Sequence, residues 1–411
     1  MATGLVPLEE ARHHVLSRVR PLEARRVRLE QALGLVLAAD VVAGATVPPF
    51  DNTAMDGVAV RAVDTAGASP AVPVRLRLIG TVHAGAAGPA VGPGEAVRIM
   101  TGAPLPAGAD AVVVVERTRA VDADAVEVLE AVEPGRHVRR AGEDVHAGQV
   151  VARAGEELTP ARVGLLAAVG TVEVLARPRP RVGVVSTGDE LVPAGRPLAA
   201  GQIHDANRPM LLALVAESGF EPVDLGRVGD DAAALVTVFG DGTARCDAVL
   251  SSGGVSMGEL DLVRVVLDRL GEFRWMQVAI RPAKPFAFGL VGRRRVPVFG
   301  LPGNPVSAVV SFELFARPAL RAMAGHRRLD RPRLRAVADE ALRRRPDGKC
   351  HFVRVACRLE RDGRVHVRSS GAQGSHQLSA LAAADGLAVL PDGDGAGPGD
   401  EVEVLVLGTL P

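Results

Sequence analysis

The chain has 411 residues, 47% of them hydrophobic, which allows two to four domains of ordinary size with buried cores. Lys plus Arg and Asp plus Glu each number 48, so the formal net charge is zero. With 3% aromatic residues and no Tyr, the chain lacks the overall positive charge and the stacking surfaces typical of nucleic-acid-binding proteins, so we expect no nucleic-acid partner.

The cysteines and the N-terminus indicate a cytoplasmic protein. Cys246, Cys350 and Cys357 include no CxxC pair, and we interpret them as structural thiols in a reducing compartment. The first residues, MATGLVPLEEARHHVL, place acids and histidines where a signal peptide has a basic start and an apolar run. The longest apolar stretches, such as Val163–Gly170, are far shorter than the roughly 18 residues that span a bilayer, so we expect no membrane partner.

The first half of the chain changes from a helical to a β pattern. Residues 5–40 have apolar side chains at helical spacing, and we predict that they are helical. From 41 to about 158 the pattern becomes short β runs, such as VPVRLRLIG and AVVVVE, separated by turn sequences. Thr159 and Pro160 then supply a cap and a first-turn proline for a short helix.

The second half predicts an α/β domain followed by a β domain. After the stiff linker Arg177–Pro180, nearly continuous apolar runs alternate with helical segments; the runs are RVGVVS, EPVDLGRV, CDAVLSS and VPVFGL. Buried strands that alternate with helices indicate a mostly parallel sheet. A second linker, His326–Arg335, ends this domain. The remainder, about 336–409, returns to alternating strands and predicts a small β-barrel or sandwich.

Three loops at predicted strand ends carry groups that bind phosphate or a metal. They are VVSTGDEL (184–191), VLSSGGVSMGELD (249–261) and VFGLPGNPVSAVVSFELF (298–315). Ligands of open α/β sheets bind beyond the carboxyl ends of the strands, where these loops would meet. Each loop alone could be a simple turn. Together, hydroxyls and open backbone N–H groups suit a phosphate, and the neighbouring carboxylates suit Mg²⁺, so we predict a magnesium–phosphate site.

Three further segments stand out. In AIRPAKPFAFG (279–289), prolines stiffen a loop that carries Arg281 and Lys284, a good clamp for an oxyanion, although an ordinary surface loop explains the spacing equally well. PPFDNTAMDGVAVR (48–61) and RIMTGAPLPAGADAVVVVE (98–116) predict ordered loops, the latter with Thr101 before a buried strand. The residues alone assign no chemistry to these two loops.

In this order, the motifs resemble those of the molybdopterin molybdenumtransferases, a family that includes the E domain of gephyrin. The matching segments are PPFDNTAMDG, RIMTGAPLPAGADAVV, VVSTGDEL, SSGGVSMGELD, RPAKPFAFG and FGLPGNPVSA, within residues 5–405. The resemblance implies a multidomain α/β plus β fold and an L-shaped homodimer. Its four subdomains would be I (1–45 plus 138–177, a helical N-terminus with a β segment), II (46–137, inserted and β-rich), III (178–325, α/β and molybdopterin-binding) and IV (330–411, a C-terminal β-barrel).

The resemblance also implies a reaction and a composite site. Adenylylated molybdopterin and molybdate would be the substrates, and Mg²⁺ the cofactor. The phosphate–adenylate bond is hydrolysed, AMP leaves, and molybdenum stays on the dithiolene sulfurs. The site would lie between subdomains III and IV of one chain and subdomain II of its partner.

Residue roles follow from the matching motifs only. The implied catalytic residues are Asp56 (from the partner chain), Thr101, Glu190, Asp230 and Asp261, with Glu190 and Asp261 as magnesium ligands. Molybdate would be received by Arg281, Lys284, Arg354 and Ser375. The nucleotide or pterin phosphates would be held by Gly253, Gly254, Ser256, Gly303 and Asn304, with Arg140 and Asp144 as further candidates near the cleft.

The chain departs from the family pattern at two places. Val58 stands where the family commonly has Tyr, so a hydroxyl contact there is absent. Arg281-Pro-Ala-Lys284 replaces the common Lys-Pro-Gly-Lys, which keeps the charge but changes its shape, so we expect oxyanion binding with altered geometry.

Two alternatives to the transferase remain. A pterin adenylyltransferase would resemble residues 178–325 alone, and a gephyrin-type scaffold would use the same module to bind peptides. For the transferase, we expect a pterin adenylyltransferase and molybdoenzyme chaperones as partners. Molybdate and tungstate have nearly the same size and charge, so both fit the same residues.

Overall fold

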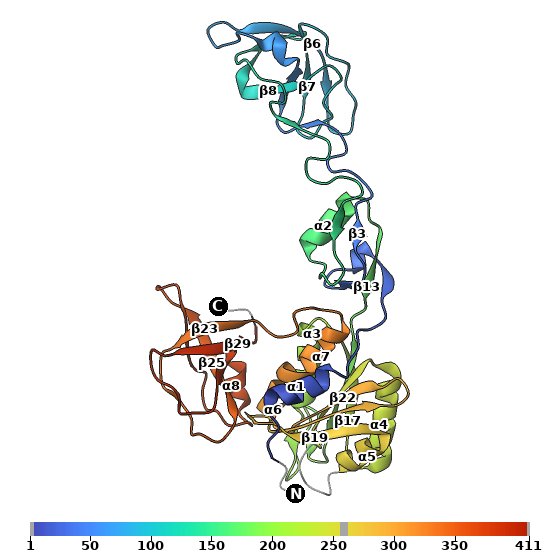
Figure 1. The fold of residues 1–411 in the computed structure, drawn as a ribbon, viewed down its shortest axis with the longest axis vertical. Coiled ribbons are helices and arrows are strands. Elements are labelled where there is room, and N and C mark those ends of the chain that lie inside the picture. Colours follow the sequence, from blue (N-terminus) through green and yellow to red (C-terminus); the bar gives the residue numbers. More distant parts are fainter. Residues whose placement is uncertain (1–3, 255–261, 409–411) are drawn as a thin grey trace.

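The computed structural model describes residues 4–254 and 262–408, which form a broad body and a long arm (Figure 1). The body combines an α/β part with a barrel that lies beside it, and the first helix and the last strand of the chain both lie in this body. The arm leaves the α/β part and carries a small sheet region first and a larger one at its tip. Ser256 and Asp261, two of the expected site residues, lie outside the described residues.

The α/β part is built on a six-stranded sheet in the order β17-β14-β18-β22-β21-β19. Its strands are β14 (Arg181–Thr187), β17 (Glu221–Val228), β18 (Ala248–Ser252), β19 (Gly271–Gln277), β21 (Pro285–Val291) and β22 (Val296–Leu301). The first four strands in spatial order run parallel to one another, and β21 runs antiparallel to both of its neighbours, β22 and β19. This confirms the predicted mostly parallel sheet.

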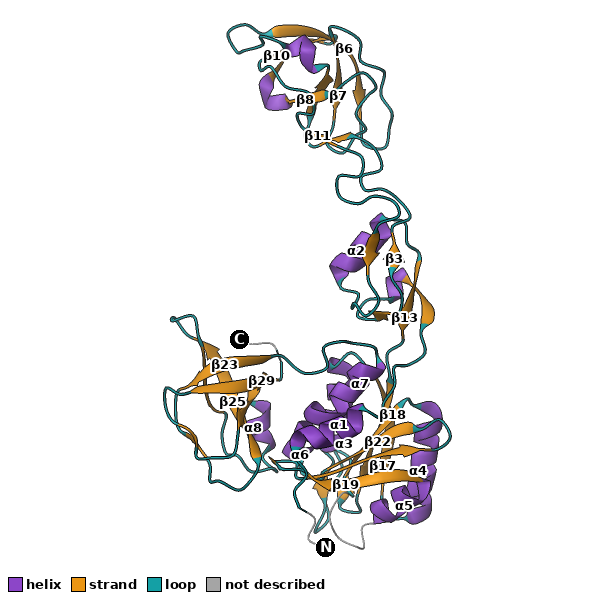
Figure 2. Cartoon of the chain, in the orientation of Figure 1, coloured by secondary structure: helices purple, strands orange, loops and turns teal. Residues whose placement is uncertain are grey.

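Helices cover both faces of this sheet, as Figure 2 shows. They are α1 (Leu8–Leu16), α3 (Asn207–Glu217), α6 (Pro305–Ser311) and α7 (Arg317–Met323) on one face, and α4 (Ala232–Arg245) and α5 (Leu262–Leu270) on the other. A π-helical turn, Phe312–Ala316, joins α6 to α7. Alternate residues of each strand pack on opposite faces: Val184 contacts the first group and Val185 the second. The central strands are therefore buried on both sides and read as continuous apolar runs.

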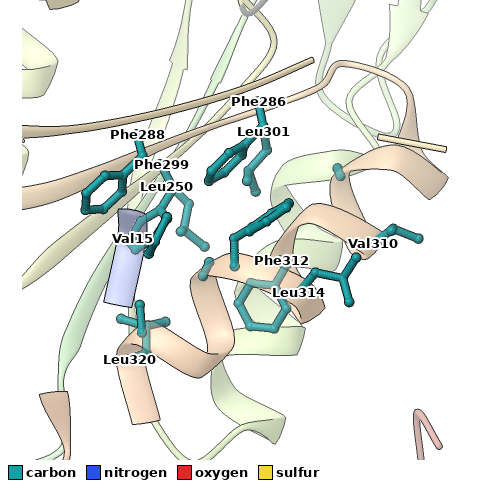
Figure 3. Packing of buried hydrophobic residues seen from close by; sticks show 14 of the residues in the cluster. Val15, Leu250, Phe286, Phe288, Phe299, Leu301, Val310, Phe312, Leu314 and Leu320 are labelled. Carbon is teal, nitrogen blue, oxygen red and sulfur yellow. The ribbon is translucent and has the colours of Figure 1, made fainter. Parts of the chain in front are cut away.

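Aromatic side chains fill the larger core (Figure 3). Phe286 and Phe315 stack with ring centroids 4.2 Å apart, and Phe288 and Phe299 lie 5.2 Å apart. All four are essentially inaccessible to solvent. This core lies directly beneath the segment that carries Arg281 and Lys284, because that segment leads into β21 at Pro285.

The helical prediction for residues 5–40 is correct only for α1. Pro21 has no N–H to continue a helix, and residues 25–40 instead contribute two short strands to the arm. Strand β1 (Arg25–Arg28) pairs with β13 (Glu173–Arg177), and β2 (Val36–Leu37) pairs with the other edge of β13. Leu29–Gln31 is a single 3-10 turn. Apolar spacing suggested a long helix, but strand pairing with β13, whose paired residues lie 139 to 151 positions further along the chain, prevailed.

The C-terminal part closes into a β-barrel, as expected. Its strands are β23 (Arg333–Ala338), β25 (Cys350–Leu359), β26 (Val365–Ser369), β27 (Gly386–Leu390) and β29 (Glu401–Val406). Closure results because β27 pairs with both β25 and β29. Around it lie α8 (Leu378–Ala382) and the short pair β24 (Leu342–Arg343) and β28 (Gly395–Ala396). Strand β20 (Ile280–Arg281) pairs in parallel with β25, which joins the α/β part to the barrel.

The arm has two β regions. Near the body, the β1-β13-β2 sheet packs with α2 (Pro160–Ala168), where Thr159 accepts a capping hydrogen bond as predicted. The pairs β3 (Val41–Val42) with β12 (Val150–Ala152) and β4 (Asn52–Thr53) with β11 (Val138–Arg139) follow. At the tip is a six-stranded sheet of β5 (Gly57–Val60), β6 (Val74–Val82), β7 (Glu95–Ile99), β8 (Ala111–Val114), β9 (Thr118–Asp122) and β10 (Ala125–Val128). Every helix in the described part of the chain is too short or too polar to cross a bilayer.

Phe286→Ala should lower the free energy of unfolding of the α/β part by about 3–5 kcal/mol, because it leaves a cavity beside Phe315. Urea unfolding followed by fluorescence of Trp275 is the measurement. Trp275 is the only tryptophan of the chain and pairs with β21 at Ala287, so its signal reports on this sheet. The matched control, Val172→Ala at an exposed position, should change the midpoint little. A loss below about 1 kcal/mol for Phe286→Ala would contradict this description of the core.

Candidate functional site

The loops after β14, β18 and β22 meet at the carboxyl edge of the parallel sheet. The chain continues from β14 to one neighbour, β17, and later returns to the other, β18, so the edge has a topological switch point between β14 and β18. The Gly253 N–H donates to the Leu301 carbonyl over 3.1 Å, and the Thr187 hydroxyl donates to the Ser252 carbonyl over 3.4 Å. These bonds hold the three loops against one another where ligands of such sheets bind.

Glycine is required at two positions in this edge. Gly253 has φ +97°, and a Cβ there would lie 2.7 Å from the Thr187 carbonyl oxygen. Gly254 has φ +68°, and a Cβ there would overlap the side chain of Val263. A Cβ on Gly303 would lie only 3.8 Å from Gly253 Cα. The backbones of these two loops therefore approach each other closely at Gly253 and Gly303, and closely approaching bare backbone suits a phosphate.

Asn207 joins two of these loops, a role that the sequence did not reveal. Its Nδ2 donates to the Ser252 hydroxyl and to the Gly303 carbonyl, both over 2.7 Å. Its buried Oδ1 has no hydrogen-bond partner within the described ranges. Asn207 is the first residue of α3, and its side chain makes these two contacts instead of capping the helix. Its contacts depend on the position of residues 45 and 96 places further on, which no local pattern signals.

The predicted acidic residues lie on two adjacent loops of the same edge. Glu190 follows β14 and Asp230 follows β17, and these strands pair up to Thr187 and Val228. The Asp230 N–H donates to Asp189 Oδ1 over 3.1 Å, which ties the loops together. Glu190 and Asp230 are exposed, and neither carboxylate accepts a hydrogen bond from the residues that the structure describes. Asp231 is occupied, because it caps α4 through Ala234 N.

The carboxylates at this edge of the sheet are of the type that binds Mg²⁺. Free carboxylate oxygens are the ligands that Mg²⁺ prefers, so Glu190 and Asp230 fit the ion. Within residues 4–254 and 262–408, however, no three His, Cys, Asp or Glu side chains converge as a complete ligand set. Mg²⁺ commonly takes only one or two protein carboxylates and completes its shell with water and substrate phosphates, which is consistent with an open pair.

A second centre lies where the α/β part meets the barrel. A cavity of about 500 Å³ is bounded by the 280–285 segment, the start of α6 and the 373–376 loop of the barrel. Arg281, Lys284 and Ser375, predicted to receive an oxyanion, line it together with Asn304, which was predicted to hold phosphates. The Val306 N–H donates to the Ser375 carbonyl over 3.1 Å, which fixes the barrel loop against α6. In the described part of the chain, neither Arg281 nor Lys284 has an ion-pair partner.

Arg354 underlies the barrel wall of this cavity. Its side chain is 0% exposed, and its Nη2 donates to the Ala372 and Gly374 carbonyls over 2.7 and 3.2 Å. Nε and Nη1 have no partner among the described residues. Burial lowers the pKa of this guanidinium from its ordinary value. Gln373 strengthens the arrangement, because its amide accepts from Arg354 N and donates to Arg354 O, both over 3.0 Å.

Lys349 also lines the cavity, and the sequence analysis missed it. Its Nζ contacts Asp347 over 2.9 Å, and this hydrogen bond is the main reason why the pKa of Asp347 is lowered to about 2. Asp347 also pairs with Arg344 and lies 3.1 Å from His351, so it balances the charge of Lys349 only in part. Arg281 and Lys284 have no ion-pair partner among the described residues. Lys349 sits in a Pro-Asp-Gly turn whose residue types suggest only a loop, so no sequence signal pointed to it.

Asp56 and Thr101 form a third centre in the tip sheet of the arm, far from the other two within one chain (Figure 1). Thr101 donates from its N–H and its hydroxyl to Asp56 Oδ1, both over 2.6 Å. These bonds, the hydroxyl first, lower the pKa of Asp56. A cavity of about 290 Å³ beside it is lined by Asp56, Val58, Arg98 and Met100 among others.

The remaining candidates lie on the arm as well. Arg140 pairs with Asp51 over 2.6 Å, so its charge is already balanced, while Asp144 is exposed with its N–H bound to the Val47 carbonyl. Val58 is buried in the tip core. Within one chain, three candidate regions therefore lie in the same body. They are the glycine loops at 253–254 and 303, the cavity lined by Arg281 and Lys284, and the loops that carry Glu190 and Asp230. The structure does not bring Asp56, Thr101, Arg140 or Asp144 to them.

Comparison with known proteins identifies the family. Three family models match: the MoeA N-terminal region (domains I and II) at residues 6–170, a probable molybdopterin binding domain at 183–322, and the MoeA C-terminal region (domain IV) at 335–407. The chain belongs to the molybdopterin molybdenumtransferase (MoeA) family. This confirms the resemblance drawn from the six motifs.

Relatives and solved structures agree over almost the whole chain. Molybdopterin molybdenumtransferase 2 of Mycobacterium tuberculosis is 42% identical, covering 94% of this chain and 95% of its own. The molybdopterin molybdenumtransferase of Haemophilus influenzae is 37% identical, covering 92% of each. A molybdopterin biosynthesis MoeA protein from Pyrococcus horikoshii has a TM-score of 0.80 at 31% identity, covering 98% of this chain and 100% of its own. These matches support the transferase over the adenylyltransferase and the scaffold.

Replacing Thr101 by Val should raise the pKa of Asp56 toward its ordinary value, because the hydroxyl donor is lost while the N–H donor stays. The lowered pKa keeps Asp56 ionised to a lower pH than an ordinary Asp, and the variant should protonate earlier as the pH falls. A pH titration of the carboxyl ¹³C shift by NMR measures this. Thr118→Val, in the same sheet, removes a hydroxyl that binds the Val115 carbonyl and should leave Asp56 unchanged. An unchanged or lower pKa of Asp56 in the Thr101 variant would refute the assigned role of the hydroxyl.

Proposed function

We propose that this chain inserts molybdenum into molybdopterin, taking molybdate and adenylylated molybdopterin as substrates and releasing AMP. In this reaction water adds across the phosphate–adenylate anhydride and AMP leaves. The two dithiolene sulfurs bond to molybdenum as one molybdate oxygen departs as water with the two thiol protons, without a change of oxidation state. The observation that carries the proposal is the cation-lined cavity between the α/β part and the barrel, in a chain whose relatives are named molybdopterin molybdenumtransferases.

Molybdate would occupy this cavity. Lys284 and Arg281 present unbalanced positive charge, and the Ser375 loop supplies a neighbouring polar wall. Arg354 keeps that loop in place through its bonds to the Ala372 and Gly374 carbonyls and adds a positive charge behind it. An oxyanion bound in this cavity would offset part of the cost of burying a guanidinium without a carboxylate.

The phosphates of the pterin substrate would lie at the sheet edge. Gly253, Gly254 and Gly303 leave backbone there without side chains, and Asn304 lines the adjoining cavity. Asn207 would keep the two glycine loops at a fixed spacing. Ser256 belongs to the same motif. One edge would thus hold the anhydride phosphates while the neighbouring cavity holds the oxyanion.

Glu190 and Asp230 would hold Mg²⁺ at this edge, together with Asp261, which follows β18 in sequence. When bound, Mg²⁺ neutralises charge on the substrate phosphates and so favours departure of AMP. The carboxylates would also orient the attacking water near the anhydride. Glu190 and Asp230 are exposed, and their carboxylates accept no hydrogen bond from the described residues, which leaves their oxygens free for this role.

The catalytic role of Asp56 requires a second copy of the chain. The arm carries Asp56 and Thr101 away from the body of their own chain, so only a partner's arm could bring them to the cation cavity (Figure 2). Phe50 and Met55, exposed large apolar residues of the same loop, support a contact surface there. We therefore propose a homodimer with two composite sites. The two hydrogen bonds from Thr101 lower the pKa of Asp56, so each site would receive an ionised carboxylate from the partner's arm.

The rest of the assignment follows from this family. We propose the four subdomains given above, except that α1 belongs with III, because Ala11 and Val15 lie in its core. The three free cysteines, two of them buried, are consistent with a cytoplasmic protein. A pterin adenylyltransferase would supply the adenylylated substrate, and molybdoenzyme chaperones would receive the product. The cavity would accept tungstate as well as molybdate.

Mixing two inactive variants tests this proposal. Wild-type chain should release AMP from adenylylated molybdopterin with molybdate and Mg²⁺, whereas Asp56→Ala and Lys284→Ala should each release little. When the two are co-expressed, half of the dimers are mixed and each holds one intact site, so about a quarter of the wild-type rate should return. AMP release measured by chromatography gives the rate.

Controls separate the parts of the proposal. EDTA should stop AMP release by the wild type, and Asp261→Asn should reduce it. Co-expression of Lys284→Ala with Arg281→Ala, both in the same body, should restore much less activity, because each mixed dimer then has a defect in both of its sites. No AMP release by the wild type with molybdate or tungstate would contradict the function. Absence of restoration in the Asp56 and Lys284 mixture would contradict the shared site.

A further inference from the structure

A second charged cavity lies at the opposite edge of the α/β sheet. It has a volume of about 370 Å³ and is formed by the segment 18–23 after α1, the 292–295 turn between β21 and β22, and the start of β18. Asp247, Val296 and Pro297 place it at the amino ends of β18 and β22. The proposed catalytic loops follow the carboxyl ends of these strands, so the two sites are separated by the length of the strands.

Arginines dominate this cavity. Five line it, against two carboxylates, those of Glu23 and Asp247; the arginines are Arg18, Arg20, Arg293, Arg294 and Arg295. Asp247 is already engaged, because Oδ2 accepts from Arg181 N over 2.9 Å and Oδ1 lies 3.4 Å from Arg294. The cavity therefore has an excess of positive charge that its own acids do not balance. In a chain with equal numbers of acids and bases, this is a local concentration.

The arginines differ in the hydrogen bonds and ion pairs that their side chains already make. Arg294 is fixed, since its Nη1 donates to the Thr243 and Ala244 carbonyls over 3.2 and 3.0 Å. Arg18 donates to the His14 carbonyl over 3.1 Å. Arg20 and Arg293 have no hydrogen bond or ion pair with any described residue. Two guanidinium groups thus remain available beside a fixed one.

The turn that presents these arginines is unfavourable by itself. Val291 pairs with Val296, and the four residues between them contain three consecutive arginines. Arg295 has φ +52°, a left-handed conformation that favours Gly or Asn. Like charges packed at one turn also repel one another. Asp247 offsets the charge of Arg294, and Glu272, outside the cavity, lies 3.9 Å from Arg295, but Arg293 has no such partner among the described residues, and a bound anion would offset its charge.

The cavity also has apolar walls. Val19, Leu22, Val296, Pro297 and Met323 line it beside the arginines. Its volume falls within the range of small-molecule sites, roughly 300–1,000 Å³. Guanidinium groups recognise phosphate oxygens through paired N–H donors, and apolar walls accept a ring. We infer that this cavity binds a small molecule that carries two or more phosphates on an apolar ring, of the nucleoside diphosphate class.

ADP is the probe, and binding by calorimetry is the measurement. The test variant is Arg20→Ser combined with Arg293→Ser, which removes the two guanidinium groups without a partner. The matched control is Arg25→Ser combined with Arg26→Ser, which removes two exposed charges from β1 outside the cavity. The wild type and the control should bind the same number of ADP molecules per chain, and the test variant should bind one fewer or bind that one at least tenfold more weakly. Equal binding by all three proteins would overturn the inference.

Two further measurements complete the test without using the transferase reaction. Pyrophosphate should bind the wild type more weakly than ADP, and equal affinity would overturn the assigned contact with the ring. Thermal unfolding without ligand should give the test variant a Tm equal to or above that of the wild type, because like charges are removed. A lower Tm accompanied by loss of binding would place the effect on folding and overturn the inference.

Discussion

The buried guanidinium of Arg354 is the interaction on which the cavity between sheet and barrel depends. A charge without a counter-ion in a protein interior is costly, and the chain tolerates it with two carbonyl acceptors and a clamp from Gln373. These bonds hold the 372–375 loop beside α6, and they place the positive charge of Arg354 on the side of the loop away from solvent. The barrel closes through β25, which carries Arg354, and β20 joins the same strand to the segment with Arg281. The fold thus sets the distance between the two walls of the cavity.

The second constraint is the length of the arm. Packing in the body and packing in the tip sheet are independent, with separate hydrophobic cores. In the described part of one chain, Asp56 lies in the arm and Lys284 in the body, and both belong to motifs of the family. The proposed site shared between two copies would bring them together, because two equal surfaces related by a twofold axis create two sites at once. In that arrangement, dimer formation and catalysis depend on the same residues of the 48–56 loop.

The sequence predicted correctly the elements with a strong pattern of apolar residues. It did not predict strands and side-chain roles that depend on contacts between residues far apart in the chain. The apolar runs of β14, β18 and β22 predicted a parallel sheet, and the edge at which its loops meet followed from that. Residues 25–40 looked helical, yet they pair with β13, a partner that spacing cannot reveal. Arg354 entered only through the family resemblance, since in sequence it is one arginine within an alternating strand. Asn207, Gln373 and Lys349 were missed because their roles arise from loops that meet only in the folded chain.

The most direct test of this account is the position of molybdenum in crystals of the protein soaked in molybdate. An anomalous difference map recorded at the molybdenum absorption edge locates the metal without reference to any activity. We expect a peak in the cavity bounded by Lys284 and Ser375, next to the loop that Arg354 holds. A map with molybdenum bound elsewhere and none in this cavity would contradict it.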